Sequence, residues 1–334
     1  MSMELKEFCR HDPSGMLDVV LSFPSSFKSM LAPLAFEPPS FSNLVISGMG
    51  ASAIAGDVLS DVLDTCGSPV QVHVNRTPSI PRWVGKDTLV IICSYSGNTW
   101  ETLLAAEDAI SRGLNVVALA SGGRLEEIAK ERSIPLLRLP GGIQPRAAFP
   151  ECMSLLLSFI IASKNPLGLH QWIEETHRDL QDVALLLEQD SKDPALALSR
   201  TIGSSNPVFY GQGYLKAAAR RASCQFNENS KLLSFHGTMP EVGHNEIVGW
   251  ANCKNDIRPV LMGEGPQVEP VAEVLGSSCI RFPLYGRNPL SKSLASIFIA
   301  DVASVYSALE RGIDPTPVEP IMRLKALMKD SIPK

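Results

Sequence analysis

The sequence predicts an α/β protein with two parallel β-sheets, each flanked by helices. Short apolar runs that favour strands alternate with longer runs that favour helices over most of the chain. A strand followed by Gly-x-Gly and a helix of small residues occurs at Gly48 and again at Gly211. A length of 334 residues also favours two domains over one. We interpret the recurrence as a faint internal duplication, with chance similarity of two α/β halves as the alternative.

The first half is expected to hold five strands. Residues 4–35 predict helices, and Pro38-Pro39 ends that segment. Small residues after the first strand allow its helix to pack closely on the sheet, and an apolar helix is expected over residues 151–163. The strands are expected at residues 44–46, 70–74, 88–92, 115–119 and 136–139.

A polar helical stretch over residues 169–198 is expected to link the halves, with a break or a new helix at Pro194. The second half is expected to contain strands at residues 207–210 and 258–262. Its helices are expected at residues 214–226, 290–311 (long and amphipathic) and 318–329. The predicted domains are therefore 1–165 and 201–334, joined by a helical linker at 166–200.

The composition excludes several classes of protein. A hydrophobic content of 45% and a charged content of 19% describe a soluble globular chain. The net charge of −5 and the lack of a basic run argue against nucleic-acid binding. We expect no signal peptide and no membrane span, because the N-terminus is polar and the apolar stretch 155–162 is short. Seven scattered cysteines without C-x-x-C spacing predict reduced thiols in the cytoplasm.

A phosphate site is predicted where the apolar run 88–92 ends. Ser94, Ser96 and Thr99 supply hydroxyl donors, and Gly97 allows the backbone to approach a ligand closely. The helix that follows would direct free N–H groups and a partial positive charge at an anion. Because the loop has no lysine or aspartate, it suits one phosphate group rather than a magnesium nucleotide. The alternative is an ordinary helix cap.

A dinucleotide site at Gly48-x-Gly50 is disfavoured. The third glycine is Gly56, which is too far along the chain for the G-x-G-x-x-G spacing. The second strand is followed by Asn75-Arg76, which offers no acid for a ribose. We therefore expect no nicotinamide cofactor.

The polar runs 225–231 and 240–246 are the candidates for acid–base chemistry. Glu228 lies between two asparagines, which suits a general base held by hydrogen bonds, and His244 lies in a glycine-punctuated loop. The alternatives are a solvated glutamate and an ordinary loop histidine. Glu241, His244 and Glu246 form only a weak ligand set, so no metal is expected. The chain has no G-x-S-x-G elbow to support a serine hydrolase.

Seven motifs together resemble the bifunctional phosphoglucose/phosphomannose isomerases, a branch of the phosphoglucose isomerase superfamily. They follow one another in the order of that family between residues 44 and 325. The motifs are Ser47–Asp57, Ser94–Thr99, Gln144–Ala148, Asn227–Asn229, His244–Trp250, Asp314–Val318 and Leu324–Lys325. The resemblance implies two sugar-isomerase (SIS) domains of flavodoxin-like, three-layer form, and a cytoplasmic homodimer with shared active sites.

The resemblance also implies roles for individual residues. Glu228 matches the catalytic base, Arg146 the residue that supports the enediolate, and His244 with Lys325 the pair linked to ring opening. In that superfamily the histidine comes from the neighbouring subunit. Thr316 lies in the motif linked to acceptance of mannose stereochemistry. The phosphate- and sugar-binding positions are Gly50, Ser52, Ser94, Ser96 and Thr99.

The implied reaction interconverts glucose 6-phosphate or mannose 6-phosphate with fructose 6-phosphate, without a cofactor. After ring opening, one carboxylate can move a proton between C1 and C2 through a planar cis-enediolate, which loses the C2 configuration. A fixed positive charge at Arg146 would stabilise the oxyanion, and the phosphate loop would orient the reacting carbons.

Three departures from the family pattern leave the relative activity on the two aldoses open: Ala51 replaces a common glycine, Trp100 a common acid, and Phe149-Pro150 a common Leu-Gly. Two other functions stay open. A sensor that binds a sugar phosphate would keep the phosphate loop without the catalytic groups. An amino-sugar phosphate isomerase or synthase would need a glutamine-processing cysteine, for which Cys9 is a poor candidate.

Overall fold

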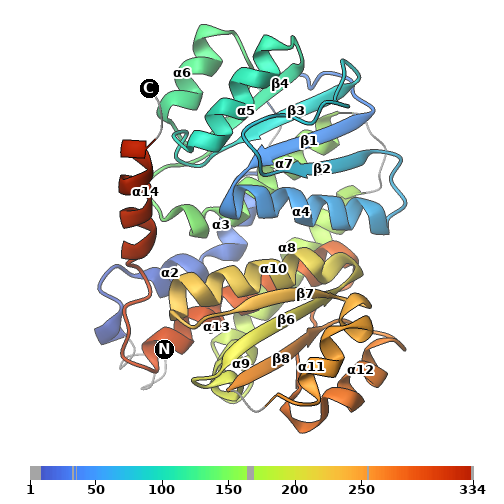
Figure 1. Cartoon of the computed structure of the whole chain (residues 1–334), viewed down its shortest axis with the longest axis vertical. Helices are drawn as coiled ribbons and strands as arrows, with labels where there is room; N and C mark the ends of the chain where they lie inside the picture. The colour runs from blue at the N-terminus through green and yellow to red at the C-terminus, as the bar shows by residue number, and fades with distance from the viewer. Residues whose placement is uncertain (1–8, 32–33, 35, 164–168, 254–255, 332–334) are drawn as a thin grey trace.

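The computed structural model describes residues 9–31, 34, 36–163, 169–253 and 256–331. It contains two parallel sheets stacked one above the other in Figure 1, with helices between them and on their outer faces. This confirms the predicted fold class. Residues 4–8, 32–33 and 35 of the predicted N-terminal helical segment lie outside the described residues.

The first sheet contains all five predicted strands. Their order is β2-β1-β3-β4-β5, the flavodoxin-like order, and every neighbouring pair is parallel. The order reverses between β1 and β3, where Gly48 lies opposite Cys93 at the carboxyl ends of both strands. The strands are β1 (Asn43–Gly48), β2 (Gln71–Asn75), β3 (Thr88–Cys93), β4 (Asn115–Ala120) and β5 (Leu136–Arg138).

Helices cover both faces of this sheet and make a three-layer unit. The side chains of β1 alternate between the faces, so that Val45 packs against one pair of helices and Leu44 and Ile46 against the other. Gly56 lets its helix approach the strand, because a Cβ there would lie 3.0 Å from Ile46. The first pair is α5 (Trp100–Ser111) and α6 (Gly123–Glu131), and the second is α4 (Gly50–Thr65) and α7 (Phe149–Ala162).

The second sheet has four parallel strands in the order β7-β6-β8-β9. Two of them, β6 (Asn206–Gln212) and β8 (Ile257–Met262), were predicted. The edge strands β7 (Phe235–Met239) and β9 (Ile280–Arg281) were not. Outer helices α11 (Glu246–Trp250) and α12 (Val268–Leu275) contribute to the apolar cluster on one face, and α10 (Lys216–Gln225) covers the other.

The central helix of the second half corrects a prediction. We expected an amphipathic helix over residues 290–311, but α13 (Pro289–Leu309) is buried on every side. Its serines, which suggest a polar face in the sequence, are small enough to pack inside the core. By length and composition α13 is the one described helix that could cross a membrane, yet 94% of its apolar window is buried within the protein. It is therefore the core helix of the molecule.

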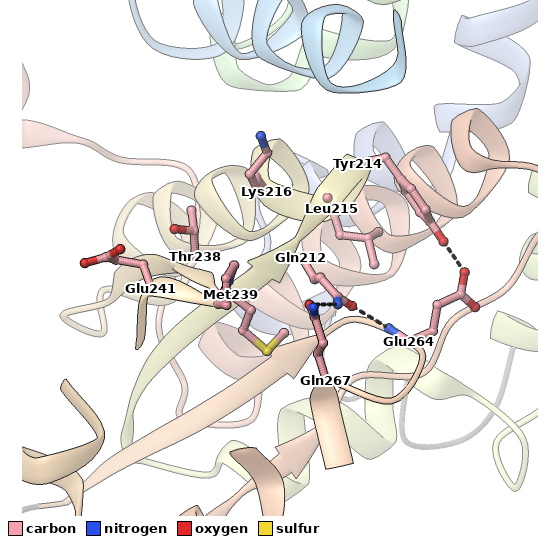
Figure 2. A pocket seen from close by; sticks show the side chains of 11 residues that line it. Gln212, Tyr214, Leu215, Lys216, Thr238, Met239, Glu241, Glu264 and Gln267 are labelled. Atoms are coloured by element: carbon pink, nitrogen blue, oxygen red, sulfur yellow. Dashed lines mark hydrogen bonds between the residues drawn. The ribbon is translucent and has the colours of Figure 1, made fainter. Parts of the chain in front are cut away.

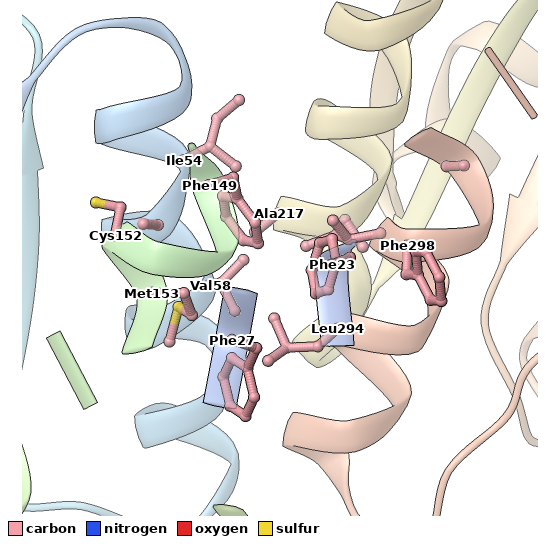
Figure 3. Packing of buried hydrophobic residues seen from close by; sticks show 14 of the residues in the cluster. Phe23, Phe27, Ile54, Val58, Phe149, Cys152, Met153, Ala217, Leu294 and Phe298 are labelled. Atoms are coloured by element: carbon pink, nitrogen blue, oxygen red, sulfur yellow. The ribbon is translucent and has the colours of Figure 1, made fainter. Parts of the chain in front are cut away.

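One hydrophobic core joins the two halves. Phe23 in α3 (Phe23–Ser29) lies 5.2 Å from Phe298 of α13 and 6.0 Å from Phe149 of α7, measured between ring centres (Figure 3). The N-terminal helices α2 (Met16–Leu21) and α3 thus pack against both halves.

The predicted linker helix is two helices, α8 (Leu169–Leu187) and α9 (Pro194–Ile202), because Pro194 starts a new one. Both pack against α13. The division of the chain at residues 165 and 200 stays a prediction. The last helix, α14 (Glu319–Ser331), runs along the side of the molecule.

Candidate active site

Two loops at the carboxyl edge of the first sheet carry the predicted phosphate groups. After β1, Gly50 and Ser52 lie in the first turn of α4, and the turn after β3 contains Ser94, Ser96 and Thr99. Because β1 and β3 are neighbours at the point where the strand order reverses, these loops lie side by side. This is the position at which open parallel sheets bind ligands. Ala51, which replaces a common glycine, is the second residue of α4 and does not have a positive φ, so the substitution causes no backbone strain there.

The hydroxyls of the second loop are not used as helix caps. Thr99 is the N-cap residue of α5, yet its side chain makes no capping hydrogen bond. It instead accepts a hydrogen bond from Ser94 Oγ at 3.1 Å, while Ser96 Oγ accepts from the backbone N–H of Asn98 at 3.2 Å. The first N–H groups of α5 therefore remain available to an anion. This arrangement argues against the ordinary cap that the sequence left open.

Gly97 is required by the shape of this loop. Its φ of +66° lies in the left-handed region, and a Cβ there would lie 1.8 Å from the carbonyl oxygen of Gly122. The neighbouring Leu125 N–H also donates to the Gly97 carbonyl at 2.9 Å. The loop is thus held against the start of α6 by contacts that exclude any side chain.

Arg146 is a buried arginine whose guanidinium group is fixed by three hydrogen bonds from two of its nitrogens. Only 5% of its surface is exposed. Its Nη2 donates to the carbonyl oxygens of Pro315 and Thr316, both at 3.0 Å, and its Nε donates to Asn229 Oδ1 at 2.7 Å. Nη1 has only a long bond of 3.5 Å, to Gln144. Nη1 is therefore the part of the guanidinium that can bind a ligand.

Glu228 lies in a widened helical turn, directly before the Asn229 that binds this arginine. Residues Phe226–Ser230 form a π-helical turn that extends α10, and Glu228 is partly exposed within it. Single π turns are frequent at functional sites. Burial lowers the pKa of Arg146, and the negative charge of Glu228 acts against that change. The two predicted catalytic groups are thus close enough to interact electrostatically.

Lys231 ends this turn and ties it to the segment that leads into α14. It adopts the left-handed conformation with a φ of +56°. Its Nζ donates to the carbonyl oxygens of Glu228, Pro315 and Pro317 at 2.5 to 2.9 Å. Arg146 and Lys231 therefore both bind the Pro315–Pro317 segment and share the Pro315 carbonyl oxygen as an acceptor.

Thr316 lies within that segment and has a buried hydroxyl. Its Oγ1 has no hydrogen-bond partner among the described residues. Its backbone N–H is fixed by Asp314 Oδ1 at 2.9 Å, so the loop conformation is defined without the hydroxyl. A buried hydroxyl without a partner is costly unless a ligand or a water completes it.

No hydrogen bond or ion pair between described residues links His244 or Lys325 to this cluster. His244 is exposed at the end of a short 3-10 turn, Glu241–His244, immediately before α11. In Figure 1, α11 and α14 lie on opposite sides of the molecule. Lys325 is exposed on α14. Glu241 and Glu246 do not form a metal cluster with His244, since no group of three ligating side chains occurs within the described residues. Glu246 instead accepts a hydrogen bond from Tyr210.

Comparison with known proteins gives the family. The family model for the "Bacterial phospho-glucose isomerase C-terminal SIS domain" matches residues 191–328. A bifunctional phosphoglucose/phosphomannose isomerase of Aquifex aeolicus is 31% identical over 86% of this chain and 91% of its own length. The chain belongs to the bifunctional phosphoglucose/phosphomannose isomerase family.

One further sequence relative and one solved structure show how far the similarity to the phosphoglucose/phosphomannose isomerases extends. A protein of Sulfolobus acidocaldarius named D-glucosamine-6-phosphate 4-epimerase is 30% identical over 83% of this chain and 86% of its own length. A crystal structure of a glucose-6-phosphate isomerase like protein from Thermus thermophilus has a TM-score of 0.69, with 19% identity and 96% coverage of both chains. The first shows that related sequences bear another activity, and the second shows a shared fold.

Sequence reasoning missed the buried residues that support Arg146 in the candidate site. Arg221 and Asp301 lie inside helices α10 and α13 and are 1% and 2% exposed. Asn229 and Lys231 fall in the polar run noted from the sequence, but their contacts were not foreseen. The one available signal was Asp301, a charged residue inside an otherwise apolar helix. Such a residue predicts a buried partner of opposite charge.

The second sheet of this isomerase-family chain has a cavity of about 690 Å³ at its carboxyl edge (Figure 2). Gln212, Thr238 and Gln267 line it together with two carboxylates, Glu241 and Glu264. Glu264 accepts a hydrogen bond from Tyr214 and is paired with Lys292 at 2.7 Å. Its carboxylates make this cavity a poor phosphate site, in spite of its volume.

Proposed function

We propose that this isomerase interconverts glucose 6-phosphate and mannose 6-phosphate with fructose 6-phosphate. The observation that carries the proposal is the buried Arg146, which has one available nitrogen and interacts electrostatically with Glu228. Family membership supports an aldose–ketose isomerisation, and the geometry of these two residues supports their roles in it.

The loops after β1 and β3 would hold the phosphate. Ser96 and Thr99 would donate their hydroxyls, and Ser94 would donate its own on release from Thr99. The N-termini of α4 and α5 would donate backbone N–H groups. This end performs no chemistry. It fixes the sugar so that C1 and C2 lie near Glu228, which removes the entropic cost of alignment from the reaction step.

Glu228 would move the proton. With the open-chain aldose bound, its carboxylate takes the C2 proton and the carbonyl oxygen at C1 becomes the enediolate oxyanion. The hydroxyl proton at O2 then passes to O1, the same carboxyl group returns its proton to C1, and the carbonyl forms at C2. Arg146 Nη1 would stabilise the oxyanion, and a preorganised charge of this kind contributes about 3 kcal/mol.

We propose that ring opening uses His244 and Lys325 in a homodimer. The separation of α11 from α14 in one chain (Figure 1) supports a histidine supplied by a second copy. The exposed apolar side chains of α14 support burial of this helix against that copy. They are Ile321, Met322, Leu324 and Leu327.

We propose that Thr316 contacts the substrate near C2. Its buried, unpartnered hydroxyl would bond to a substrate hydroxyl and tolerate both epimers. A cytoplasmic site of action is also proposed, because the six cysteines whose side chains the structure describes are free thiols, as a reducing compartment would keep them. The Sulfolobus relative supports a second candidate, a reaction of glucosamine 6-phosphate.

The test is a coupled assay with fructose 6-phosphate that scores glucose 6-phosphate and mannose 6-phosphate separately, with a chelator present. We expect both products from the wild type. We expect Glu228→Gln to lose at least about a thousandfold in kcat, because the shuttle is removed, while inorganic phosphate still competes for the site. Glu273→Gln, an exposed carboxylate on α12, is the matched control and should turn over normally.

Lack of either product from fructose 6-phosphate would refute the proposed reaction. Conversion of glucosamine 6-phosphate in the same preparation would then favour the second candidate. Persistent activity of Glu228→Gln would instead remove only the assignment of the base.

A further inference from the structure

The positioning network behind Arg146 begins with a fully buried ion pair. Arg221 donates through Nε to Asp301 Oδ1 at 3.0 Å and through Nη2 to Oδ2 at 2.5 Å. The guanidinium carbon of Arg221 also lies 4.3 Å from the ring centre of Phe149. Burial of two charges is expensive, and apolar residues of similar volume often give equal stability. Stability alone therefore does not account for this pair.

One arm of the network reaches the backbone of Arg146. Arg221 Nη2 donates to the Arg146 carbonyl oxygen at 2.9 Å. The short turn Pro145–Ala147 that carries Arg146 is thereby fixed to α10 and, through Asp301, to α13. A side chain whose own backbone is fixed has less conformational freedom to lose when it binds a ligand.

The other arm reaches the side chain of Arg146. Ser304 Oγ donates to the Asp301 carbonyl at 2.6 Å and accepts from Asn229 Nδ2 at 2.9 Å. Asn229 Oδ1 then accepts from Arg146 Nε at 2.7 Å. This bond also fixes the orientation of the Asn229 amide. Both arms therefore start at Asp301 and close on Arg146.

The closed path also includes the neighbour of the proposed base. Asn229 follows Glu228 directly in the π-helical turn, so the bond that orients the guanidinium also holds the backbone next to Glu228. All of Arg221, Asn229, Asp301 and Ser304 are at most 2% exposed. Water therefore has little access through which to loosen these bonds.

We infer that Arg221, Asp301, Ser304 and Asn229 form a positioning network that aims Arg146 Nη1 at the developing oxyanion and keeps it in register with Glu228. This inference rests on the proposed isomerisation. None of the four touches the site surface, so their effect acts through Arg146. Loss of the network should lower kcat with little change in KM, since phosphate is held by separate loops.

The decisive variant is Ser304→Ala. It leaves Asn229 Nδ2 without its acceptor, and we expect kcat to fall roughly fivefold, the size of one lost hydrogen bond. The matched control is Ser296→Ala, a buried serine on the same helix whose hydroxyl has no partner among the described residues. It should keep the wild-type kcat. KM and inhibition by inorganic phosphate should be unchanged in both.

A second variant separates positioning from stability. Arg221→Met combined with Asp301→Leu replaces the ion pair by apolar side chains and should still unfold cooperatively. We expect its kcat to fall on the order of tenfold, because the Arg146 backbone loses its anchor.

Equal kcat values for Ser304→Ala and Ser296→Ala would overturn the inference, as would a wild-type kcat in the double variant. A parallel loss of kcat, phosphate affinity and melting temperature would also overturn it, because that pattern marks general damage. If the wild type itself lacked turnover, the proposed function would fail first. An active wild type together with an unchanged kcat in Ser304→Ala would refute only the inference about the network.

Discussion

The two halves of the molecule contain the same turn but different chemistry. In each, the first strand ends in Gly-x-Gly, and the second glycine has a φ of +52° (Gly50) or +54° (Gly213). In each, the first glycine has no room for a side chain, because a Cβ on Gly48 or Gly211 would lie within 2.6 Å of a carbonyl oxygen. The strand order 2-1-3-4 is also common to both sheets. These matches favour the internal duplication that the sequence suggested.

The halves differ in the loop after the third strand. The first half has the hydroxyls of Ser94, Ser96 and Thr99 there, whereas the second has Gly263-Glu264-Gly265. A carboxylate thus occupies the region where the first half offers hydroxyls and N–H groups. The comparison teaches that the fold sets where a ligand can bind, and that a few loop side chains decide which ligand it is.

The largest expected contrast concerns backbone shape. Gly97→Ala should destabilise the protein by about 3 kcal/mol, since a left-handed residue would gain a Cβ that overlaps Gly122. Gly265→Ala should cost only about 1 kcal/mol, because its φ of +90° is strained but its Cβ would meet nothing within 4 Å. Urea unfolding measures both. Equal losses would show that the first loop is no more constrained than the second.

The next contrast concerns the hydroxyls. Ser96→Ala should raise KM for fructose 6-phosphate about tenfold, the value of one hydrogen bond to a charged group, with a smaller effect on kcat. Thr238→Ala removes a hydroxyl from the second cavity and should change KM less than twofold. Steady-state kinetics and competition by inorganic phosphate measure both. A stronger effect of Thr238→Ala would place the phosphate in the second half.

The sequence predicted those elements whose signal is local. All five strands of the first sheet are compact apolar runs and were found. The edge strand β7 was missed because His236 and Gly237 interrupt it and Phe235 is half-exposed, while β9 has only two residues. The burial of α13 was missed because its serines imitate a polar face.

The same distinction holds for the site. The hydroxyl loop could be predicted because it adjoins a strand and a helix in sequence. The bonds of Arg146 could not, since Asn229 and Thr316 lie 83 and 170 positions away. Arg221 and Asp301 carry no motif at all. Their importance follows from burial and from three-dimensional contacts that a single sequence does not contain.

The smallest expected contrast concerns charge alone. Hydrogen bonds from Lys292 and then Tyr214 lower the pKa of Glu264, so its ionised form stabilises the folded state. That stability is present above the ordinary glutamate pKa and is lost as the pH falls through the lowered value. Because the side chain is half-exposed, Glu264→Gln should cost only about 0.5 kcal/mol at pH 7. The difference from the wild type should vanish in acid.

The same variant should leave kcat, KM and phosphate inhibition unchanged. Removal of one carboxylate does not create a phosphate site, because the second loop still lacks the three hydroxyls that the first supplies. Calorimetric titration of Glu264→Gln with inorganic phosphate should therefore give one site per chain, as in the wild type. A second site would mean that the charge of Glu264 alone prevents phosphate binding in the second half. The shared turn at Gly213 would then suffice to hold an anion once Glu264 is replaced by a neutral residue.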